Sequence, residues 1–211
     1  LPELMARLAP EHPYLITSFG PRRYWDPSSP EYVPNMMPQE NSSFEKARLY
    51  AQNWEAYVED YAGNNLGGIA FCWQDRLEGT ATWFGITDYK SRLKPAYYGL
   101  KSAWLDEAHN TPLAEAYIVA PNRVLSPGET VTFQAATPNN LDEELHYEWF
   151  LMREKYLDES GDVKRADSGR KAEVEIPDDE YSYRLYLYIS DQAGNVVTAS
   201  QPLLIARENG A

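Results

Sequence analysis

The stretch PYLITSFGP, residues 13–21, has the pattern of a strand that ends in a loop. Its apolar residues 14–16 favour extended structure, whereas Gly20 and Pro21 interrupt strands. Ser18 stands between these two parts, where the strand meets solvent. The sequence therefore predicts a buried strand whose last polar residue lies beside a loop.

The residues that follow predict a helix and a second strand. Apolar side chains recur every third or fourth position over residues 44–61, which is typical of one buried helix face. Ser42 and Glu45 fit a capping box at the start of this helix, and Gly63 fits its end. The run LGGIAFCW, residues 66–73, is too short for a helix and predicts a strand buried on both faces.

A last helix is predicted from Pro95 to about Glu107. The order strand, helix, strand, helix, with continuously apolar strands, is typical of parallel βα units.

From about Leu113 the rhythm changes to short segments of alternating polarity, separated by turn residues. This pattern predicts an antiparallel β-sandwich, in which Trp149 fills the core rather than stacking on a ligand. We expect a domain boundary near 109–114, which divides the chain into residues 1–110 and 111–211. The expected fold class is α/β followed by all-β.

The composition limits the partners of this chain. Among its 211 residues, 19 basic and 32 acidic side chains give a net charge of −13. Nucleic acid and anionic membrane surfaces require a positive field, so neither is expected as a partner. Neutral ligands such as sugars are compatible with this charge, and the 16 Tyr and 6 Trp residues favour them.

No cofactor or metal is expected. Cys72 is the single cysteine, so a disulfide within the chain is excluded. We interpret it as a small buried apolar residue. The histidines 12, 109 and 146 do not have metal-ligand spacing. No apolar run reaches the roughly 18 residues of a membrane span. The chain begins at Leu1 without an initiator methionine, so we expect a fragment or a processed product.

Residues 13–104 resemble the C-terminal quarter of a clan A glycoside hydrolase (β/α)8 barrel, close to the family 2 pattern. The resemblance is carried by PYLITSFGP, SSFEKARLYAQNWEAYV, LGGIAFCWQDRLEGTATWFGI and LKPAYYGLKSAW. These pieces are similar to strand 7, helix 7, strand 8 and helix 8, so the resemblance implies an incomplete barrel. The remaining residues resemble Ig-like or PKD-like modules, on SPGETVTFQA and YISDQAGNVV.

The resemblance implies a carbohydrate-active protein that is inactive as written. Retaining glycosidases need an acid/base carboxyl and a nucleophilic carboxylate about 5–5.5 Å apart. In the family the nucleophile is a Glu at the end of strand 7, where this chain has Ser18. A serine without an adjacent base cannot replace it, and the family's acid/base lies on strand 4, outside this chain. Hydrolase activity would require the missing barrel part and a Glu at this position. The serine is either the natural residue of a silent enzyme or an engineered replacement of the Glu.

Four further residues are candidates for sugar binding. The resemblance places Trp73 at the end of strand 8 as an aromatic platform, with core packing as the alternative. Gln74 and Asp75 follow on the rim and are candidates for hydrogen bonding to sugar hydroxyls. A surface pairing of Asp75 with Arg76, or of Arg76 with Glu78, is the favoured alternative. Trp25 forms either a wall of the same cleft or an anchor of its loop.

Three other residues carry open alternatives. Arg22 and Arg23 stand out in an acidic chain and either meet a charged sugar or are solvated loop charges. Trp83 lines the rim or packs within its loop.

Two parallel strands alone would leave edges and apolar faces exposed, so we expect a further barrel portion, from the same protein or another chain, as a partner. The alternative is a small standalone α/β domain. The expected ligand is an oligosaccharide or glycoside. A second hypothesis is a non-catalytic scaffold protein whose Ig-like domain contacts a partner. The resemblance also implies a periplasmic or extracellular location.

Overall fold

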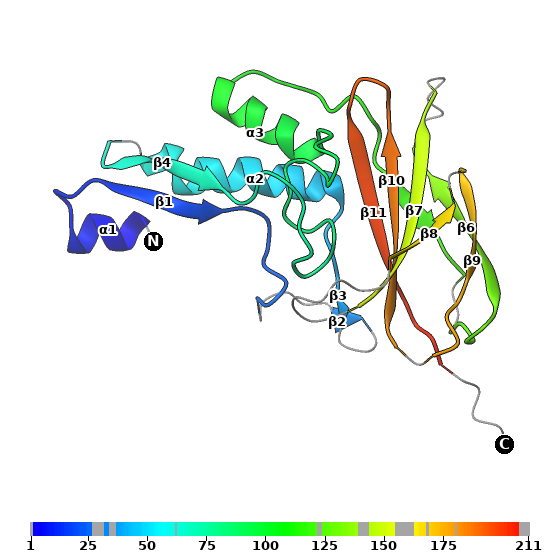
Figure 1. The fold of residues 1–211 in the computed structure, drawn as a ribbon. Helices are drawn as coiled ribbons and strands as arrows, with labels where there is room; N and C mark the ends of the chain where they lie inside the picture. The colour runs from blue at the N-terminus through cyan, green and yellow to red at the C-terminus, as the bar shows by residue number, and fades with distance from the viewer. Residues whose placement is uncertain are drawn as a thin grey trace.

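The computed structural model describes residues 2–26, 32–33, 37–61, 63–121, 124–138, 144–154, 163–167, 169–179 and 181–206. The helices are α1 (Pro2–Leu8), α2 (Ser43–Tyr57) and α3 (Pro95–Leu105), with a 3-10 turn at Glu59–Tyr61. The strands are β1 (Tyr14–Phe19), β2 (Tyr32–Val33), β3 (Met37–Pro38), β4 (Asn65–Ala70), β5 (Tyr117–Val119), β6 (Thr130–Ala136), β7 (His146–Arg153), β8 (Val163–Asp167), β9 (Lys171–Glu175), β10 (Tyr183–Ser190) and β11 (Val196–Leu203). The chain is a mixed α/β protein whose sheets are mostly antiparallel. Figure 1 shows β1, β4 and the helices at one end and the antiparallel sheets at the other.

The first part of the chain is built from two parallel strands and two helices. β1 and β4 pair in parallel, and α2 and α3 pack against them. The predicted strand, the presence of both helices and the capping box are confirmed, but α2 ends at Tyr57, before the predicted stop at Gly63. Ser42 Oγ accepts the Glu45 amide at 3.2 Å, and the Glu45 carboxylate accepts the Ser42 amide at 3.0 Å.

The prediction that the second strand is buried on both faces is wrong. Leu66 is 69% exposed, Ile69 is 54% exposed, and Leu15 on β1 is 44% exposed. The reason is that the two helices cover one face of the pair, while in the described residues no element covers the other. This face of Leu15, Leu66 and Ile69 is called the bare sheet face below.

The second part consists of two antiparallel sheets around a shared core. Their strand orders are β11-β10-β7-β8 and β5-β6-β9. Buried and exposed residues alternate along β6 and β9, as expected when one face of a sheet is solvated. Trp149 is fully buried in this core and donates its Nε1–H to the Gly169 carbonyl at 2.8 Å, which confirms its predicted core position.

β10 joins the two parts of the molecule. All eight of its residues are buried, because one face lies on the shared core and the other faces the loop after β4. The Tyr186 hydroxyl, for example, accepts the amide of Ala81 at 3.1 Å. At the start of α2, Ser43 Oγ donates to the Thr198 carbonyl on β11 at 2.9 Å. The loop that follows β4 is therefore held between the helices and the four-stranded sheet.

Candidate functional site

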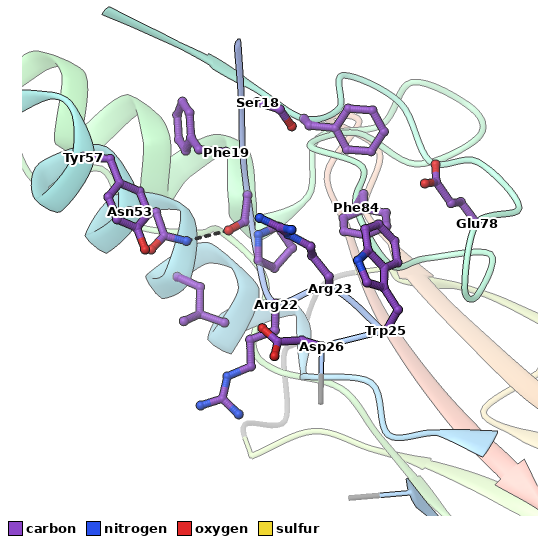
Figure 2. A pocket seen from close by; sticks show the side chains of 14 residues that line it. Ser18, Phe19, Arg22, Arg23, Trp25, Asp26, Asn53, Tyr57, Glu78 and Phe84 are labelled. Carbon is purple, nitrogen blue, oxygen red and sulfur yellow. Dashed lines mark hydrogen bonds between the residues drawn. The ribbon is translucent and has the colours of Figure 1, made fainter. Parts of the chain in front are cut away.

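A cavity of about 630 Å³ opens where β1 and β4 end. Ser18 contributes the last exposed hydroxyl of β1, and the loop to Asp26 forms the floor. Asn53 and Tyr57 on α2 line one side, and Phe84 lines the other (Figure 2).

The loop after β1 is fixed by its backbone. The Gly20 carbonyl accepts a hydrogen bond from Asn53 Nδ2 at 2.5 Å. A Cβ at Gly20 would lie 2.8 Å from the Phe71 carbonyl oxygen, so this close approach requires glycine. Trp83 donates its Nε1–H to the Arg22 carbonyl at 2.6 Å. Two anchors from different elements thus hold the cavity floor.

Aromatic rings form one wall of the cavity. Trp25 is 51% exposed and meets Tyr24 edge-on, with ring centroids 4.5 Å apart. The ring centroid of Phe84 lies 6.3 Å from that of Trp25 and 5.4 Å from that of Phe71. Of the alternatives open for Trp83, the structure shows loop packing, because its side chain is 2% exposed. The indole of Trp25 remains accessible to a ligand.

The Ser18 hydroxyl faces the cavity without activation. Among the described residues, no side chain hydrogen bonds to its oxygen, and no histidine lines the cavity. A serine needs an adjacent base to become a nucleophile. The hydroxyl can therefore donate and accept hydrogen bonds but cannot attack a substrate.

Trp73 and Gln74 lie outside the lining of this cavity. Trp73 is 62% exposed, and its carbonyl accepts both the amide and the hydroxyl of Thr87 at 2.8 Å. Gln74 Nε2 donates to the Tyr89 carbonyl at 3.1 Å and to Ser91 Oγ at 3.2 Å. The structure thus brings Ser18 and Trp25 together but not these two residues.

Asp75 differs from the accessible rim carboxylate that was expected. Its side chain is buried, and its oxygens accept hydrogen bonds from Lys94 Nζ at 2.8 and 2.9 Å and from the Gly85 amide at 2.8 Å. Burial raises the pKa of Asp75, and the Lys94 ammonium opposes that rise. The pairing with Arg76 does not form, because the lysine that folds back from the start of α3 occupies the carboxylate.

A second buried ion pair lies beside the first and was missed by sequence reasoning. Lys46 on α2 pairs with Glu40, and both side chains are 4% exposed. Thr82 links the two pairs, since its carbonyl accepts from Lys46 Nζ and from Lys94 Nζ, each at 2.9 Å. No local pattern reveals this arrangement, because Asp75, Thr82 and Lys94 come from a later part of the chain than Glu40 and Lys46.

Glu40 also reaches the four-stranded sheet. Its carboxylate accepts hydrogen bonds from Thr80 Oγ1 at 2.8 Å, Thr82 Oγ1 at 2.6 Å and Ser200 Oγ at 2.7 Å. Burial alone would raise the pKa of Glu40, but the charges of Lys46 and Arg184 and the hydrogen bonds lower it to about 2. Residues 80–84, which carry Phe84 into the cavity wall, are therefore held by a charged network.

Arg184 completes this network from β10. It is 1% exposed, pairs with Glu154, and donates to the Pro38 carbonyl at 2.8 Å and to Ser200 Oγ at 3.2 Å. Burial raises the pKa of Glu154, while Arg184 opposes that rise. We refer to Glu40, Lys46, Asp75, Lys94 and Arg184 with their partners as the buried charge network.

Cys72 is half-buried rather than fully buried as expected, because β4 ends before it. Its Sγ donates to the Gln74 carbonyl at 3.1 Å, and burial raises the pKa of its thiol. Within the described ranges, no group of three or more His, Cys, Asp or Glu side chains could hold a metal ion. None of the helices described is both long and apolar enough to cross a membrane.

Comparisons with known proteins give distant matches. No family model matches this chain, and no curated protein matches it. One similar solved structure is a conjugative transposon lipoprotein from Bacteroides eggerthii, with 13% identity and a TM-score of 0.25, covering 42% of this chain and 93% of that one. Another is the endo-β-1,4-mannanase from Thermotoga petrophila, with 13% identity and a TM-score of 0.30, covering 98% of this chain. The chain spans 42% of the length of that mannanase.

Proposed function

We propose that this chain is the sugar-binding, catalytically silent C-terminal part of a protein built like a retaining β-glycoside hydrolase. Residues 1–110 would supply the last two βα units of the barrel, and residues 111–211 an Ig-like β-sandwich. The observation that carries the proposal is the shared cavity of Ser18 and Trp25 at the carboxyl ends of two parallel strands. In barrel enzymes this end of the strands holds the ligand.

The cavity offers the contacts that a sugar needs. Its volume of about 630 Å³ lies in the range of small-ligand sites. The exposed ring of Trp25 can stack on the C–H face of a sugar ring. Ser18, Asn53 and Tyr57 present hydroxyl and amide groups from the other sides. One apolar wall facing several polar groups is suited to a ring that is apolar on its faces and polar at its edge.

We expect the cavity to be inactive because it lacks the negative charge of a nucleophilic carboxylate. An oxocarbenium-like transition state is stabilised by a carboxylate, and Ser18 carries none. Asp75 cannot substitute, because its oxygens are bonded to Lys94 and the Gly85 amide.

Tryptophan fluorescence during titration with neutral β-linked oligosaccharides tests sugar binding. We expect a saturable change that Trp25→Ala abolishes, since this indole lines the cavity. Trp104→Ala is the matched control, because Trp104 is 52% exposed on α3 and does not line the cavity. A flat signal over a broad panel would count against the proposal.

The Ser18→Glu variant tests the lost nucleophile. The assay requires the complete barrel, because the acid/base carboxyl of the family lies outside this chain. We expect hydrolysis of aryl β-glycosides by the Glu variant and none by Ser18→Ala. A folded Ser18→Glu protein that stays inactive would contradict the loss of a single nucleophile as the cause.

The bare sheet face is the second part of this proposal. Its apolar side chains, and the unpaired edges of β1 and β4 in the described residues, would be covered by the remaining barrel portion, from the same protein or another chain. Export to the periplasm or the cell exterior belongs to the same proposal and is tested by cell fractionation.

A non-catalytic scaffold is the second candidate function. The edge strand β5 favours it, because Tyr117 is 48% and Val119 is 54% exposed there. If no sugar binds, and Tyr117→Ser removes binding to a partner isolated with the full-length protein, this function replaces the first.

A further inference from the structure

Some arginines of this protein have carboxylate partners, whereas others have none among the described residues. Arg92 pairs with Asp88 at 2.6 Å and with Glu148 at 2.8 Å. Arg22 and Arg23 line the cavity, yet among the described residues neither forms an ion pair or a side-chain hydrogen bond. Both side chains are exposed, so they give this hollow a local positive charge in a chain whose net charge is −13.

The backbone around these arginines is held in place. The Arg22 carbonyl accepts from Trp83, and the Arg23 carbonyl accepts the Asp26 amide at 3.2 Å. In Figure 2 the Arg23 side chain rises toward the end of β1 and Ser18, whereas Arg22 extends to the other side of the loop. Arg23 is therefore the cation inside the hollow, and Arg22 lies at its rim.

The carboxylates of the cavity do not neutralise this cation. Glu78 and Asp26 also line the hollow, but neither lies within the 4.0 Å of an ion pair with Arg23. Figure 2 shows Glu78 beyond the rings of Trp25 and Phe84, as seen from Arg23. A ligand that stacks on Trp25 could thus place a negative group on Arg23 without displacing a protein carboxylate.

Guanidinium groups select a particular ligand chemistry. The planar fork of arginine forms two parallel hydrogen bonds with a carboxylate or a sulfate-type oxyanion, which a neutral hydroxyl cannot match. We propose that the cavity binds a β-linked oligosaccharide that carries an acidic substituent, a uronic carboxylate or a sulfate ester, and that Arg23 holds the anionic group. This inference rests on the proposed sugar binding at the same cavity.

Matched ligands test the inference by isothermal titration calorimetry on the full chain. A neutral β-linked disaccharide, its uronic acid counterpart and its sulfated counterpart differ in the substituent alone. We expect at least one acidic ligand to bind about tenfold or more tightly than the neutral one, as charge-assisted hydrogen bonds are stronger than neutral ones. The preferred acidic ligand identifies the substituent.

Variants separate the arginine from the general charge of the protein. Arg23→Ala should remove the advantage of the acidic ligand over the neutral one, whereas Arg23→Lys should keep part of that advantage. Arg170→Ala makes the same charge change on an exposed residue beside β9 and should alter the affinity for neither the acidic nor the neutral ligand.

The outcomes distinguish the two proposals. Equal binding of neutral and acidic ligands, unaffected by Arg23→Ala, overturns this inference and leaves sugar binding intact. Absence of binding by all three ligands overturns both. Equal affinity for inorganic sulfate and the sulfated disaccharide would show a simple anion site and overturn the inference for a sugar.

Discussion

A single carboxylate, that of Glu40, joins the helices to the four-stranded sheet. It accepts hydrogen bonds from Ser200 on β11 and from Thr80 and Thr82 in the loop after β4, and it pairs with Lys46 on α2. Breaking one partner of a buried pair leaves an uncompensated charge, which costs more than the pair itself contributes. We therefore expect the residues of the buried charge network to be sensitive to substitution.

The stability contribution of Glu40 should depend on pH. Its pKa is lowered from 4.5 to about 2 in the folded protein, so the contribution is present above pH 4.5 and is lost as the pH falls toward 2. At about 1.4 kcal/mol per pKa unit, this corresponds to about 3 kcal/mol at neutral pH. Urea unfolding of wild type and Glu40→Gln should give a difference that shrinks from pH 7 to pH 3. The free energy of unfolding of the variant must be subtracted from that of wild type at each pH. Burial raises the pKa values of Asp75 and Glu154, so these two groups change the stability of both proteins with pH in the opposite direction. A difference that stays constant over this range would contradict the assignment.

Two lysines allow a matched comparison of buried and exposed pairs. Lys94 is 2% exposed and pairs with Asp75, whereas Lys90 is 47% exposed and pairs with Glu148. We expect Lys94→Met to lower the free energy of unfolding by about 3–5 kcal/mol, because the carboxylate stays buried. Lys90→Met should cost less than about 1 kcal/mol. Chemical denaturation measures both, and equal losses would refute the role of burial.

At the scale of the elements, α2 and α3 meet through a glycine. A Cβ at Gly99 would lie 2.6 Å from the Ala47 carbonyl oxygen, well inside contact distance. The close packing of the two helices over β1 and β4 therefore depends on the absence of a side chain at this position.

Gly99→Ala should destabilise the protein although alanine is the better helix former. The gain in helix propensity is at most about 1 kcal/mol, whereas forcing an overpacked contact costs about 1–3 kcal/mol. Thermal unfolding followed by circular dichroism should show a lower midpoint for Gly99→Ala. Lys101→Ala on the same helix serves as the control and should leave the midpoint nearly unchanged. A raised midpoint for Gly99→Ala would mean that the helices can separate at little cost.

For the whole molecule, the bare sheet face is the main exposed apolar feature of the parallel pair. Edges and apolar faces of this kind template association between chains. The two parts of the molecule are nevertheless tied together by polar contacts, such as the buried one of Ser43 with Thr198 and the partly buried one of Tyr98 with Asn195 at 2.5 Å. Self-association is therefore expected at the sheet face rather than between the halves.

The double variant Leu66→Lys, Ile69→Lys should reduce self-association of the chain. Both side chains are more than half exposed, so the substitutions remove little buried surface and add charge to the face. Light scattering over a concentration series should fall relative to wild type. Tyr181→Lys is the control, because Tyr181 is 52% exposed before β10 and its substitution should change nothing. If the double variant scatters like wild type, association does not involve this face.

Local features were predictable from the sequence, whereas the environment of the site was not. The strand 14–19, both helices and the capping box follow from patterns within a few residues, and the structure confirms them. Asp75 was misjudged because its partner, Lys94, lies on another element, and no local pattern indicates which of two nearby cations a carboxylate will meet. The burial of the second strand was misjudged because burial depends on what packs above a strand, not on its own composition.

The amino-acid sequence by itself determined the strand-helix-strand-helix order of residues 14–105, the core position of Trp149 and the serine at the end of the first of these strands. The tertiary structure decided that Ser18 and Trp25 share a cavity, that two buried lysines meet two buried acids, and that Arg23 lacks a carboxylate partner among the described residues. The physical reason is the sequence distance over which each kind of interaction acts. Backbone propensity and side-chain periodicity act over a few residues, whereas desolvation and charge pairing depend on distances between atoms that only the folded chain brings together.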